Sequence, residues 1–452
     1  MKKISRVLIA NRGEIAVRII RACREIGIET ILAVSQADKE SLPAKMADRS
    51  ICIGPPAPAQ SYLKVDTIIA AALGTGSDAI HPGYGFLAEQ PKFPRACAEH
   101  GLIFIGPHAE NIRQMGDKLL ARQVARSVGI PMIPGSELVT DHEEALKTAD
   151  TIGYPVLLKA SAGGGGKGMK IVQKPQELKT AFAEASAEAR SAFGDDRMYM
   201  EKLIANARHI EIQIMGDSHG NFVHLFERDC SLQRRYQKLV EESPSTAVNP
   251  ELREKICRAA LDIARNIKYE NAGTVEFILD QDQNQFYFLE MNTRIQVEHP
   301  VTEMVTGTDL VQEQFHIAVG EPLSFKQEDI KLKGHAVECR INAESPDKGF
   351  MPNPGLLTQW QPREGANIRI DTHCFPGYFV PPYYDSLLAK VITIGPDRSQ
   401  AIGRMKGVLD GFTYGGLDTN IPFHRMLMDK KDYLQGNINT RWVENILAEE
   451  KK

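Results

Sequence analysis

The sequence predicts an α/β protein with a parallel sheet at its N-terminus, a small glycine-loop unit and a mixed β-sheet at its C-terminus. The chain has 452 residues, and at roughly 150 residues per domain this length suggests about three structural units. Short apolar runs alternate with amphipathic helical stretches near the N-terminus, whereas strands with a period of two dominate the C-terminal half. Together these observations favour about three α/β units, with one large α/β enzyme as the alternative.

The N-terminal segment begins with a βαβ pattern. An apolar run at 7–10 is followed by an amphipathic stretch at 14–26 and a second apolar run at 30–34. A helix pattern at 65–73 and strand patterns at 79–80 and 102–105 extend this unit into an open, mostly parallel sheet. The first loop lacks the G-x-G-x-x-G fingerprint, which argues against nicotinamide binding. We assign residues 1–115 to this N-terminal domain.

The next segment, about residues 135–203, has a different character. Strands are expected at 154–159, 169–172 and 197–201, with an Ala-rich helix at 177–192. We interpret this small unit as a lid and include it in a central domain at 116–330. Strand patterns at 209–215, 222–227 and 337–343 predict the mixed sheet, and residues 331–452 form the predicted C-terminal domain.

The composition excludes several classes of protein. With 42% hydrophobic and 25% charged residues, the chain is neither disordered nor fibrous. A formal net charge of -4 gives no global attraction to nucleic acid or anionic lipid, and no apolar run reaches the ~20 residues of a membrane helix. Seven cysteines without a C-x-x-C pair indicate reduced thiols. We therefore expect a cytoplasmic protein with no nucleic-acid or membrane partner.

A glycine cluster at 162–169 lies between two predicted strands. Without side chains, its backbone can approach phosphate oxygens and donate N–H groups to them. It is not a Walker A loop, because Gly168 follows Lys167 where Ser or Thr would be required. A flexible surface turn is the alternative, and the flanking Lys159 and Lys167 favour phosphate contact.

A polar face follows the aromatic run at 286–288. In an extended strand, alternate side chains share one face, which here presents Glu290, Asn292, Arg294, Gln296 and Glu298. A hairpin turn at 280–285 would bring Glu276 beside Glu290. Their oxygen atoms suit Mg²⁺, which bridges nucleotide phosphates, and Arg294 would hold an anion nearby. The alternative is a half-exposed strand whose polar side faces water.

Three further segments carry polar side chains. The strand at 209–214 puts His209, Glu211 and Gln213 on one face. The basic residues at 228–238 would ordinarily form a solvated charged surface, and this segment alone does not indicate a function. The loop at 81–89 follows a parallel strand, where binding residues commonly lie, although a structural turn is an equal alternative.

Together the glycine-rich hairpin, Lys118, Lys159, the carboxylates and the βαβ unit resemble the ATP-grasp superfamily. Within it, five segments are highly similar to the biotin carboxylase family: 9–16, 81–89, 159–169, 290–300 and 334–344. The resemblance runs from about residue 5 to 447 and implies an ATP-grasp fold with a Rossmann-like N-terminal domain, a mobile lid and a C-terminal mixed β-sheet domain.

The resemblance also implies an activity. In that family ATP phosphorylates bicarbonate, and the carboxyphosphate, or the CO₂ it releases, carboxylates biotin on a carrier protein. The implied cofactors are ATP with Mg²⁺ or Mn²⁺, and biotin. The implied partners are a biotin carboxyl carrier protein and a carboxyltransferase subunit, with a homodimer as the assembly. The chain contains no biotinylation motif, so we expect it to act on a carrier in trans. Acetyl-CoA is the expected acceptor, with propionyl-CoA, pyruvate and 2-oxo acids as alternatives.

The resemblance assigns roles to motif-matched residues. Glu298 would be the general base, Arg340 would stabilise the biotin enolate, and Glu276, Glu290 and Asn292 would hold the metal. Bicarbonate and biotin would be bound by Lys238, Arg294, Gln296, the Val297 backbone, Arg340 and Tyr84. The nucleotide would be bound by Lys118, Lys159, Gly164, Gly165, Gly166, Glu201, Lys202, Ile204, His209, Gln233, Tyr236, Glu276, Ile278 and Glu290.

Two positions depart from the family pattern. Tyr236 stands where the family often has a histidine near the ribose, and Ala162 replaces a frequent glycine. Two other functions remain as alternatives: a different ATP-grasp ligase that joins a carboxylate to an amine, or a nucleotide-sensing subunit without catalysis. Biotin-dependent turnover would separate the first from a biotin carboxylase, and hydrolysis of ATP would separate the second.

Overall fold

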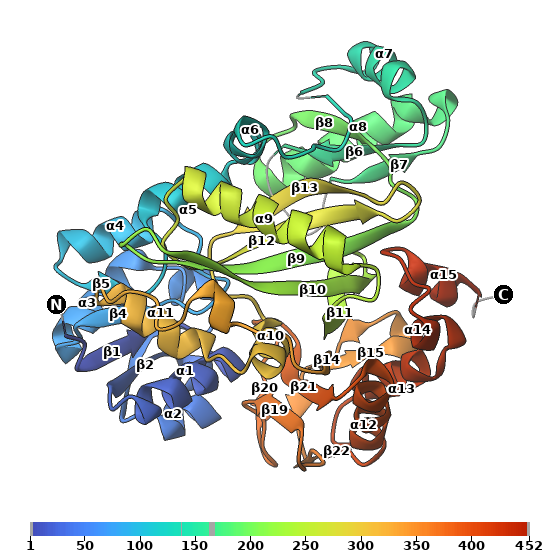
Figure 1. Cartoon of the computed structure of the whole chain (residues 1–452). Helices are drawn as coiled ribbons and strands as arrows, with labels where there is room; N and C mark the ends of the chain where they lie inside the picture. The colour runs from blue at the N-terminus through green and yellow to red at the C-terminus, as the bar shows by residue number, and fades with distance from the viewer. Residues whose placement is uncertain (1–2, 137, 162–167, 450–452) are drawn as a thin grey trace.

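The computed structural model describes residues 3–136, 138–161 and 168–449 (Figure 1). Its N-terminal unit is a five-stranded parallel sheet with strand order β3-β2-β1-β4-β5. The expected βαβ opening is confirmed, whereas the edge strand β3 and helix α4 have no counterpart among the predicted elements. The elements are β1 (Arg6–Ile9), α1 (Gly13–Glu25), β2 (Glu29–Ser35), α2 (Leu42–Met46), β3 (Arg49–Gly54), α3 (Val65–Thr75), β4 (Ala79–His81), α4 (Lys92–Glu99) and β5 (Ile103–Phe104).

The small glycine-loop unit is a separate three-stranded antiparallel sheet, which we call the lid unit (residues 138–161 and 168–202). Its strands run in the order β7-β6-β8, and helices α7 and α8 cover it above the main body in Figure 1. Apolar residues from both helices and all three strands form its own core. The elements are α7 (His142–Ile152), β6 (Val156–Ala160), β7 (Lys170–Val172), α8 (Pro175–Phe193) and β8 (Met198–Lys202).

The rest of the chain is built on one eight-stranded antiparallel sheet with the order β13-β12-β9-β10-β11-β14-β21-β19. The contact between β11 and β14 joins the central and C-terminal segments into one sheet. Its strands are β9 (Ala207–Gly216), β10 (Phe222–Arg234), β11 (Gln237–Ser243), β12 (Asn271–Asp280), β13 (Gln285–Asn292), β14 (His335–Asn342), β19 (Ile368–Thr372) and β21 (Leu387–Gly395).

Both faces of β9 are buried. Ile210, Ile212 and Ile214 pack against helix α9 (Pro250–Asn266) in one apolar core. On the alternate positions, Glu211 and Gln213 have no exposed surface. The polar face predicted for this strand is therefore inside the protein, and it must be satisfied by other protein groups or by a ligand.

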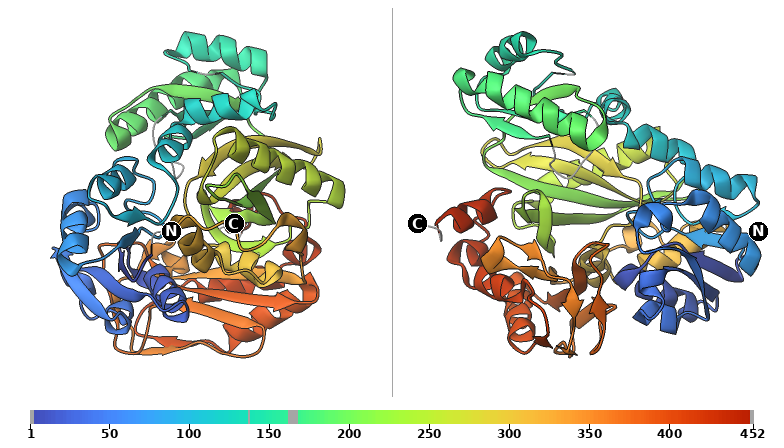
Figure 2. Two further views of the ribbon diagram at one scale, coloured as in Figure 1. Left: turned by 60° about the vertical axis from the view of Figure 1, so that its left-hand side comes forward. Right: turned by 180° about the vertical axis from the view of Figure 1, so that it is seen from behind.

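Helices and short ladders complete the molecule. Figure 2 shows the N-terminal unit and the C-terminal helices at opposite ends of the long sheet, with the lid unit above it. No helix in the described ranges is long and apolar enough to cross a membrane. The remaining elements are α5 (Ala109–Gly116), α6 (Lys118–Ser127), α10 (His299–Thr306), α11 (Leu310–Ala318), β15 (Glu344–Ser345), β16 (Met351–Pro352), β17 (Gly355–Leu356), β18 (Gln359–Gln361), β20 (Phe379–Val380), α12 (Arg398–Asp410), β22 (Thr413–Gly415), α13 (Ile421–Asp429), α14 (Lys431–Gln435) and α15 (Trp442–Glu449).

A buried ion cluster fastens the C-terminal helices to the junction of β11 and β14. The Glu242 carboxylate lies 2.7 Å from His335 Nε2 and 2.6 Å from Arg398 Nε. Burial alone would raise the pKa of Glu242, but the His335 hydrogen bond and the Arg398 charge lower it to about 2. The ionised carboxylate is therefore the form that stabilises the fold.

We predict that Glu242→Gln lowers the free energy of unfolding by roughly 3 kcal/mol at neutral pH, because Arg398 is left without its buried counter-ion. Since the folded pKa lies below the ordinary value of 4.5, the contribution is complete above that pH and is lost as the pH falls toward about 2. Urea denaturation across this window should show the two proteins converging. A difference that stays constant with pH would contradict this assignment, and Glu254→Gln, on the exposed face of α9, is the control that should change stability little.

Candidate functional site

Lys238 lies at the centre of the site. Its Nζ atom is 2.5 Å from Glu211 Oε2, 2.6 Å from Glu298 Oε1 and 3.1 Å from Glu276 Oε1. Gln296 Oε1 accepts a further hydrogen bond at 3.2 Å. Burial alone would lower the pKa of Lys238, but the three carboxylates raise it well above its ordinary value. The ammonium is therefore charged and holds together side chains from β9, β12 and the segment after β13.

Arg228 holds the carboxylate of Glu211 from the other side. Its guanidinium has no exposed surface and contacts Glu211 through Nε. It also donates to Gln213 at 2.8 Å and to the hydroxyl of Thr302 at 2.9 Å. The tract at 228–238 is thus not an ordinary solvated surface at two positions: Arg228 is buried and Lys238 is half-buried, and both contact carboxylates of the site.

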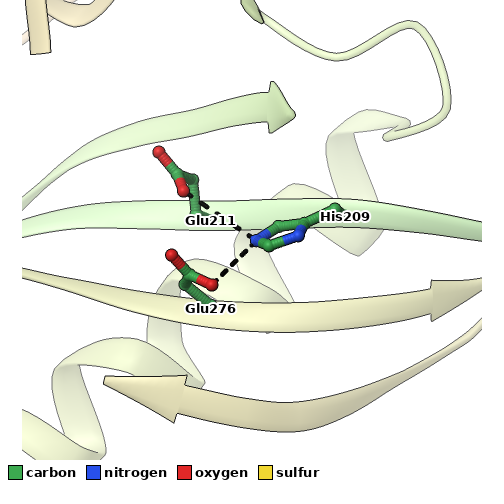
Figure 3. A group of neighbouring side chains, drawn as sticks. All are labelled: His209, Glu211 and Glu276. Carbon is green, nitrogen blue, oxygen red and sulfur yellow. Dashed lines mark ion pairs between the residues drawn. The ribbon is translucent and has the colours of Figure 1, made fainter. Parts of the chain in front are cut away.

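His209 joins the same cluster (Figure 3). Its Nε2 atom lies 2.9 Å from Glu276 Oε2 and 4.0 Å from Glu211 Oε2. The amide nitrogen of Gln233 is 2.8 Å from Nδ1, which assigns Nδ1 as the acceptor and places the ring proton on Nε2, toward the carboxylates. Burial opposes the charged ring, but Glu276 raises the pKa of His209 above its ordinary value.

The predicted metal ligands come together on β12 and β13. Glu276 and Glu290 are direct cross-strand partners, next to a bulge in the ladder. Asn292 Nδ2 donates to Glu276 Oε1 at 2.8 Å. Desolvation and the charge of Glu276 raise the pKa of Glu290. Two facing carboxylates with an amide beside them fit a hard divalent cation, which would relieve their repulsion.

A second group of ligating atoms, from His209, Glu211 and Glu276, lies within 4.8 Å of one another. Both oxygens of Glu211 are already engaged by cations, Arg228 and Lys238. A metal ion there would compete with two fixed positive charges. Glu276, Glu290 and Asn292 also have cationic neighbours, but all three offer oxygen donors, which a hard divalent cation prefers to the His209 nitrogen.

The segment after Asn292 differs from the prediction of one long polar strand. Strand β13 ends at Asn292, an irregular turn covers 293–298, and α10 begins at His299 with Glu298 at its N-cap. Arg294, Gln296 and Glu298 therefore do not share a strand face with Glu290. Within this turn Gln296 still hydrogen-bonds Lys238 and Glu276. Gln296 therefore reaches the site from a turn and not from a strand face.

Arg294 is anchored by a residue to which the sequence assigned no role. Its Nε atom lies 2.8 Å from Glu89 Oε2, and Glu89 Oε1 accepts from the backbone N–H of Thr293 at 3.1 Å. Arg294 Nη2 also donates to Asn292 Oδ1 at 3.0 Å. Glu89 ends the 81–89 loop, so that loop contributes directly to the site.

Glu298 is shared between two cations. Its Oε1 contacts Lys238, and its Oε2 lies 2.9 Å from Arg340 Nη2. Burial opposes ionisation, but Lys238 and Arg340 lower the pKa of Glu298 far below its ordinary value. Arg340 also donates to Glu241 Oε1 at 2.6 Å, and burial raises the pKa of Glu241 to about 7. No motif in the sequence singled out Glu241.

The lid unit and helix α6 together form a separate basic cluster. Lys159 Nζ lies 2.5 Å from Glu201 Oε2, and Arg122 of α6 contacts the other oxygen of Glu201. Lys118, at the start of α6, has its pKa lowered by burial and by the charge of Lys159, against the pull of Glu290. The charge of Lys118 therefore interacts both with Lys159 of the lid unit and with Glu290 of β13.

The other predicted nucleotide residues are placed as follows. Lys202 donates to the backbone oxygens of Gly153 and Tyr154 at 2.8 and 2.9 Å, so its ammonium is engaged within the lid unit. Tyr236 is 49% exposed at the β10–β11 turn with φ of 65°. Ile204 and Ile278 are half-buried, and Gly164, Gly165, Gly166 and the departure at Ala162 lie outside the described residues.

Tyr84 and Val297 are each held by a residue distant in the sequence. The Tyr84 hydroxyl donates to Glu14 of α1. The Val297 carbonyl accepts from Lys390 Nζ of β21 at 2.8 Å. Neither Glu14 nor Lys390 was singled out as a site residue in the sequence.

Known families match the chain along almost its whole length. The biotin carboxylase N-terminal domain matches residues 3–112, and the ATP binding domain of the carbamoyl-phosphate synthase L chain matches 117–326. The biotin carboxylase C-terminal domain matches residues 338–445. The long sheet and the lid unit together correspond to the second and third of these matches.

Individual proteins are also similar to the chain. Biotin carboxylase 1 of Bacillus subtilis is 52% identical over 98% of each chain. A pyruvate carboxylase subunit from Methanothermobacter thermautotrophicus is 50% identical over 97% of this chain and 89% of its own length. A crystal structure of the biotin carboxylase domain dimer of Hydrogenobacter thermophilus 2-oxoglutarate carboxylase, with MgADP, ADP and bicarbonate, superposes with a TM-score of 0.94 at 47% identity over 98% of each chain.

We predict that Arg228→Met destabilises the protein by roughly 3–5 kcal/mol, because Glu211 loses one of its two buried cationic partners. Chemical denaturation would measure this loss. The double variant Arg228→Met with Glu211→Gln should recover part of it, since no unpaired carboxylate remains. Wild-type stability in Arg228→Met alone would show that the guanidinium does not hold Glu211, and Arg258→Met on the exposed face of α9 is the matched control.

Proposed function

The chain belongs to the biotin carboxylase family of ATP-grasp enzymes, and we propose that the cluster around Lys238 is the site at which it activates bicarbonate. Biotin carboxylase is an ATP-dependent ligase that carboxylates biotin. The observation that supports this location is the position of Glu298, whose ionised carboxylate lies 2.6 Å from Lys238 and 2.9 Å from Arg340. An ionised carboxylate beside fixed cations can accept a proton from an anion that those cations attract.

In this proposal bicarbonate binds beside Lys238, Arg294, Gln296 and the Val297 backbone. Lys238 and Arg294 reduce the repulsion between bicarbonate and the phosphate of ATP, and Glu298 removes the bicarbonate proton. The bicarbonate oxygen attacks the terminal phosphorus, so carboxyphosphate forms and ADP leaves. Biotin is then carboxylated with release of phosphate, while Arg340 stabilises its enolate and Tyr84 contacts it.

Glu276, Glu290 and Asn292 would hold Mg²⁺ or Mn²⁺, which supplies charge neutralisation for the phosphates when bound. For the nucleotide we propose Lys118, Lys159, the loop at Gly164, Gly165 and Gly166, Glu201, Lys202, Ile204, His209, Gln233, Tyr236 and Ile278, together with Glu276 and Glu290. The cluster of Lys159, Arg122 and Glu201 supports a phosphate site beneath the lid unit. The exposed phenol of Tyr236 would hydrogen-bond the ribose where the family often has histidine.

We propose domain boundaries at 1–115, 116–330 and 331–452, and a homodimer like the Hydrogenobacter domain dimer. The proposed partners are a biotin carboxyl carrier protein and a carboxyltransferase subunit. A cytoplasmic location is supported by seven unpaired cysteines. Acetyl-CoA is the proposed acceptor on family resemblance. The similar chains from a pyruvate carboxylase and a 2-oxoglutarate carboxylase make pyruvate and 2-oxo acids alternatives, with propionyl-CoA as another.

We predict that Arg294→Ala loses activity mainly in kcat, by about a hundredfold or more, because the guanidinium stabilises charge that develops in the transition state. The measurement is ADP release with Mg²⁺-ATP over a range of bicarbonate concentrations. Unchanged turnover would remove Arg294 from the mechanism. Arg265→Ala, on the exposed face of α9, is the control that keeps wild-type kinetics.

We predict that free biotin stimulates ADP release by the wild-type chain, and that Arg340→Ala abolishes the stimulation while retaining slow, biotin-independent release. Arg340 is then needed for the biotin step and not for nucleotide binding. Wild-type turnover that is indifferent to biotin would instead indicate another ATP-grasp ligase. Nucleotide binding without turnover would indicate a nucleotide-sensing subunit.

A further inference from the structure

Lys390 of β21 is a fully buried lysine that the proposed mechanism does not use. It has no exposed surface, and its Nζ atom donates to the backbone oxygen of Val297 at 2.8 Å. The same ammonium lies 3.1 Å from Glu14 Oε2 and 3.8 Å from Asp371 Oδ2. A charge is costly to bury unless its partners are arranged around it, so the position of Lys390 is specified by these three contacts.

The hydrogen bond to Val297 acts on the backbone of the bicarbonate turn, residues 293–298. The carbonyl belongs to the peptide group that joins Val297 to Glu298. Because that group is planar, fixing its oxygen limits rotation about the bonds on both sides of it. The direction in which the Glu298 side chain leaves the backbone is therefore set in part by Lys390.

Residues of two neighbouring strands, β14 and β21, contact this turn. Lys390 of β21 is the register partner of Arg340 of β14. Arg340 holds the Glu298 carboxylate, while Lys390 holds the carbonyl immediately before Glu298. The side chain and the backbone of the proposed base are thus fixed from the same sheet.

Glu14 connects Lys390 to the N-terminal unit. It lies at the start of α1, and its second oxygen accepts from the Tyr84 hydroxyl. One carboxylate therefore serves both Lys390 and Tyr84. Asp371, the more distant anion, is also paired with Arg369 at 2.8 Å, so Glu14 is the closer counter-ion of Lys390.

We propose that Lys390 is a positioning residue that orients the Val297–Glu298 peptide for bicarbonate, with Glu14 as the counter-ion that also sets Tyr84. This inference rests on the proposed function of the Lys238 cluster. In this inference the hydrogen bond from Lys390 to Val297 and the ion pair of Lys390 with Glu14 have different roles. The hydrogen bond orients the turn, and the charge pair makes burial of the ammonium tolerable.

The alternative is that Lys390 and Glu14 form an ion pair that only stabilises the fold. The double variant Glu14→Gln with Lys390→Met separates the two cases. It removes both buried charges together, and the new glutamine keeps an oxygen that can accept from Tyr84. It therefore avoids the unpaired charge that Lys390→Met alone would leave, while the donor to Val297 is lost.

The experiment compares the wild type, Lys390→Met, the double variant and Val391→Ala. Val391 is the adjacent residue on β21 and packs in the apolar core on the opposite face of the strand. Thermal unfolding and steady-state ADP release with biotin are measured, with bicarbonate and ATP varied separately. We expect Lys390→Met to have a lower Tm than the double variant, because only the single variant leaves Glu14 without its counter-ion. The double variant should regain much of the Tm that Lys390→Met loses.

The inference predicts that the double variant keeps a KM for bicarbonate about tenfold above wild type, because a hydrogen bond from a charged donor is missing. Its KM for ATP should stay within about twofold, as in Val391→Ala. Recovery of the bicarbonate KM together with Tm would overturn the inference, and so would a parallel rise in both KM values. A wild type without bicarbonate-dependent, biotin-stimulated ADP release would instead overturn the proposed function.

Discussion

The site depends on one buried ammonium that is shared by three carboxylates. Glu211, Glu276 and Glu298 all lie within 3.1 Å of Lys238 Nζ. Each carboxylate also has a second cationic or protonated partner, in the order Arg228, His209 and Arg340. Carboxylates this close repel one another strongly in a low dielectric, so the arrangement persists only while Lys238 is charged and in place. The cations of the site therefore also stabilise the fold, because each is paired with a buried carboxylate.

The long sheet explains how these groups meet. Glu211 and Glu276 lie directly opposite each other on β9 and β12, and Glu276 is in turn opposite Glu290 on β13. Lys238 reaches them from β11, the strand that joins the central segment to β14 of the C-terminal segment. The turn at 293–298 then crosses from β13 to α10, and Arg340 contacts Glu298 at its end. Residues from the central and C-terminal segments thus converge on the long sheet.

The sequence predicted the residues of this site better than their contacts. A period of two correctly put His209, Glu211 and Gln213 on one face, because strand alternation is a local property. The same rule failed at 293–298, where the chain leaves the strand and α10 begins. Arg228, Glu89, Glu241 and Glu14 were not identified as partners, because each pairs with a residue distant in sequence. Burial of such charges is decided by tertiary packing, which no local pattern reports.

The most direct test is transfer of radiolabelled bicarbonate to free biotin by the purified chain with Mg²⁺-ATP. We expect ATP-dependent labelling of biotin by the wild type. Lys238→Gln should bind nucleotide at the lid unit but transfer label at least about a hundredfold more slowly, because the shared cation is gone. Label transfer at the wild-type rate by Lys238→Gln, or no transfer to biotin by the wild type under any condition, would contradict this account of the site.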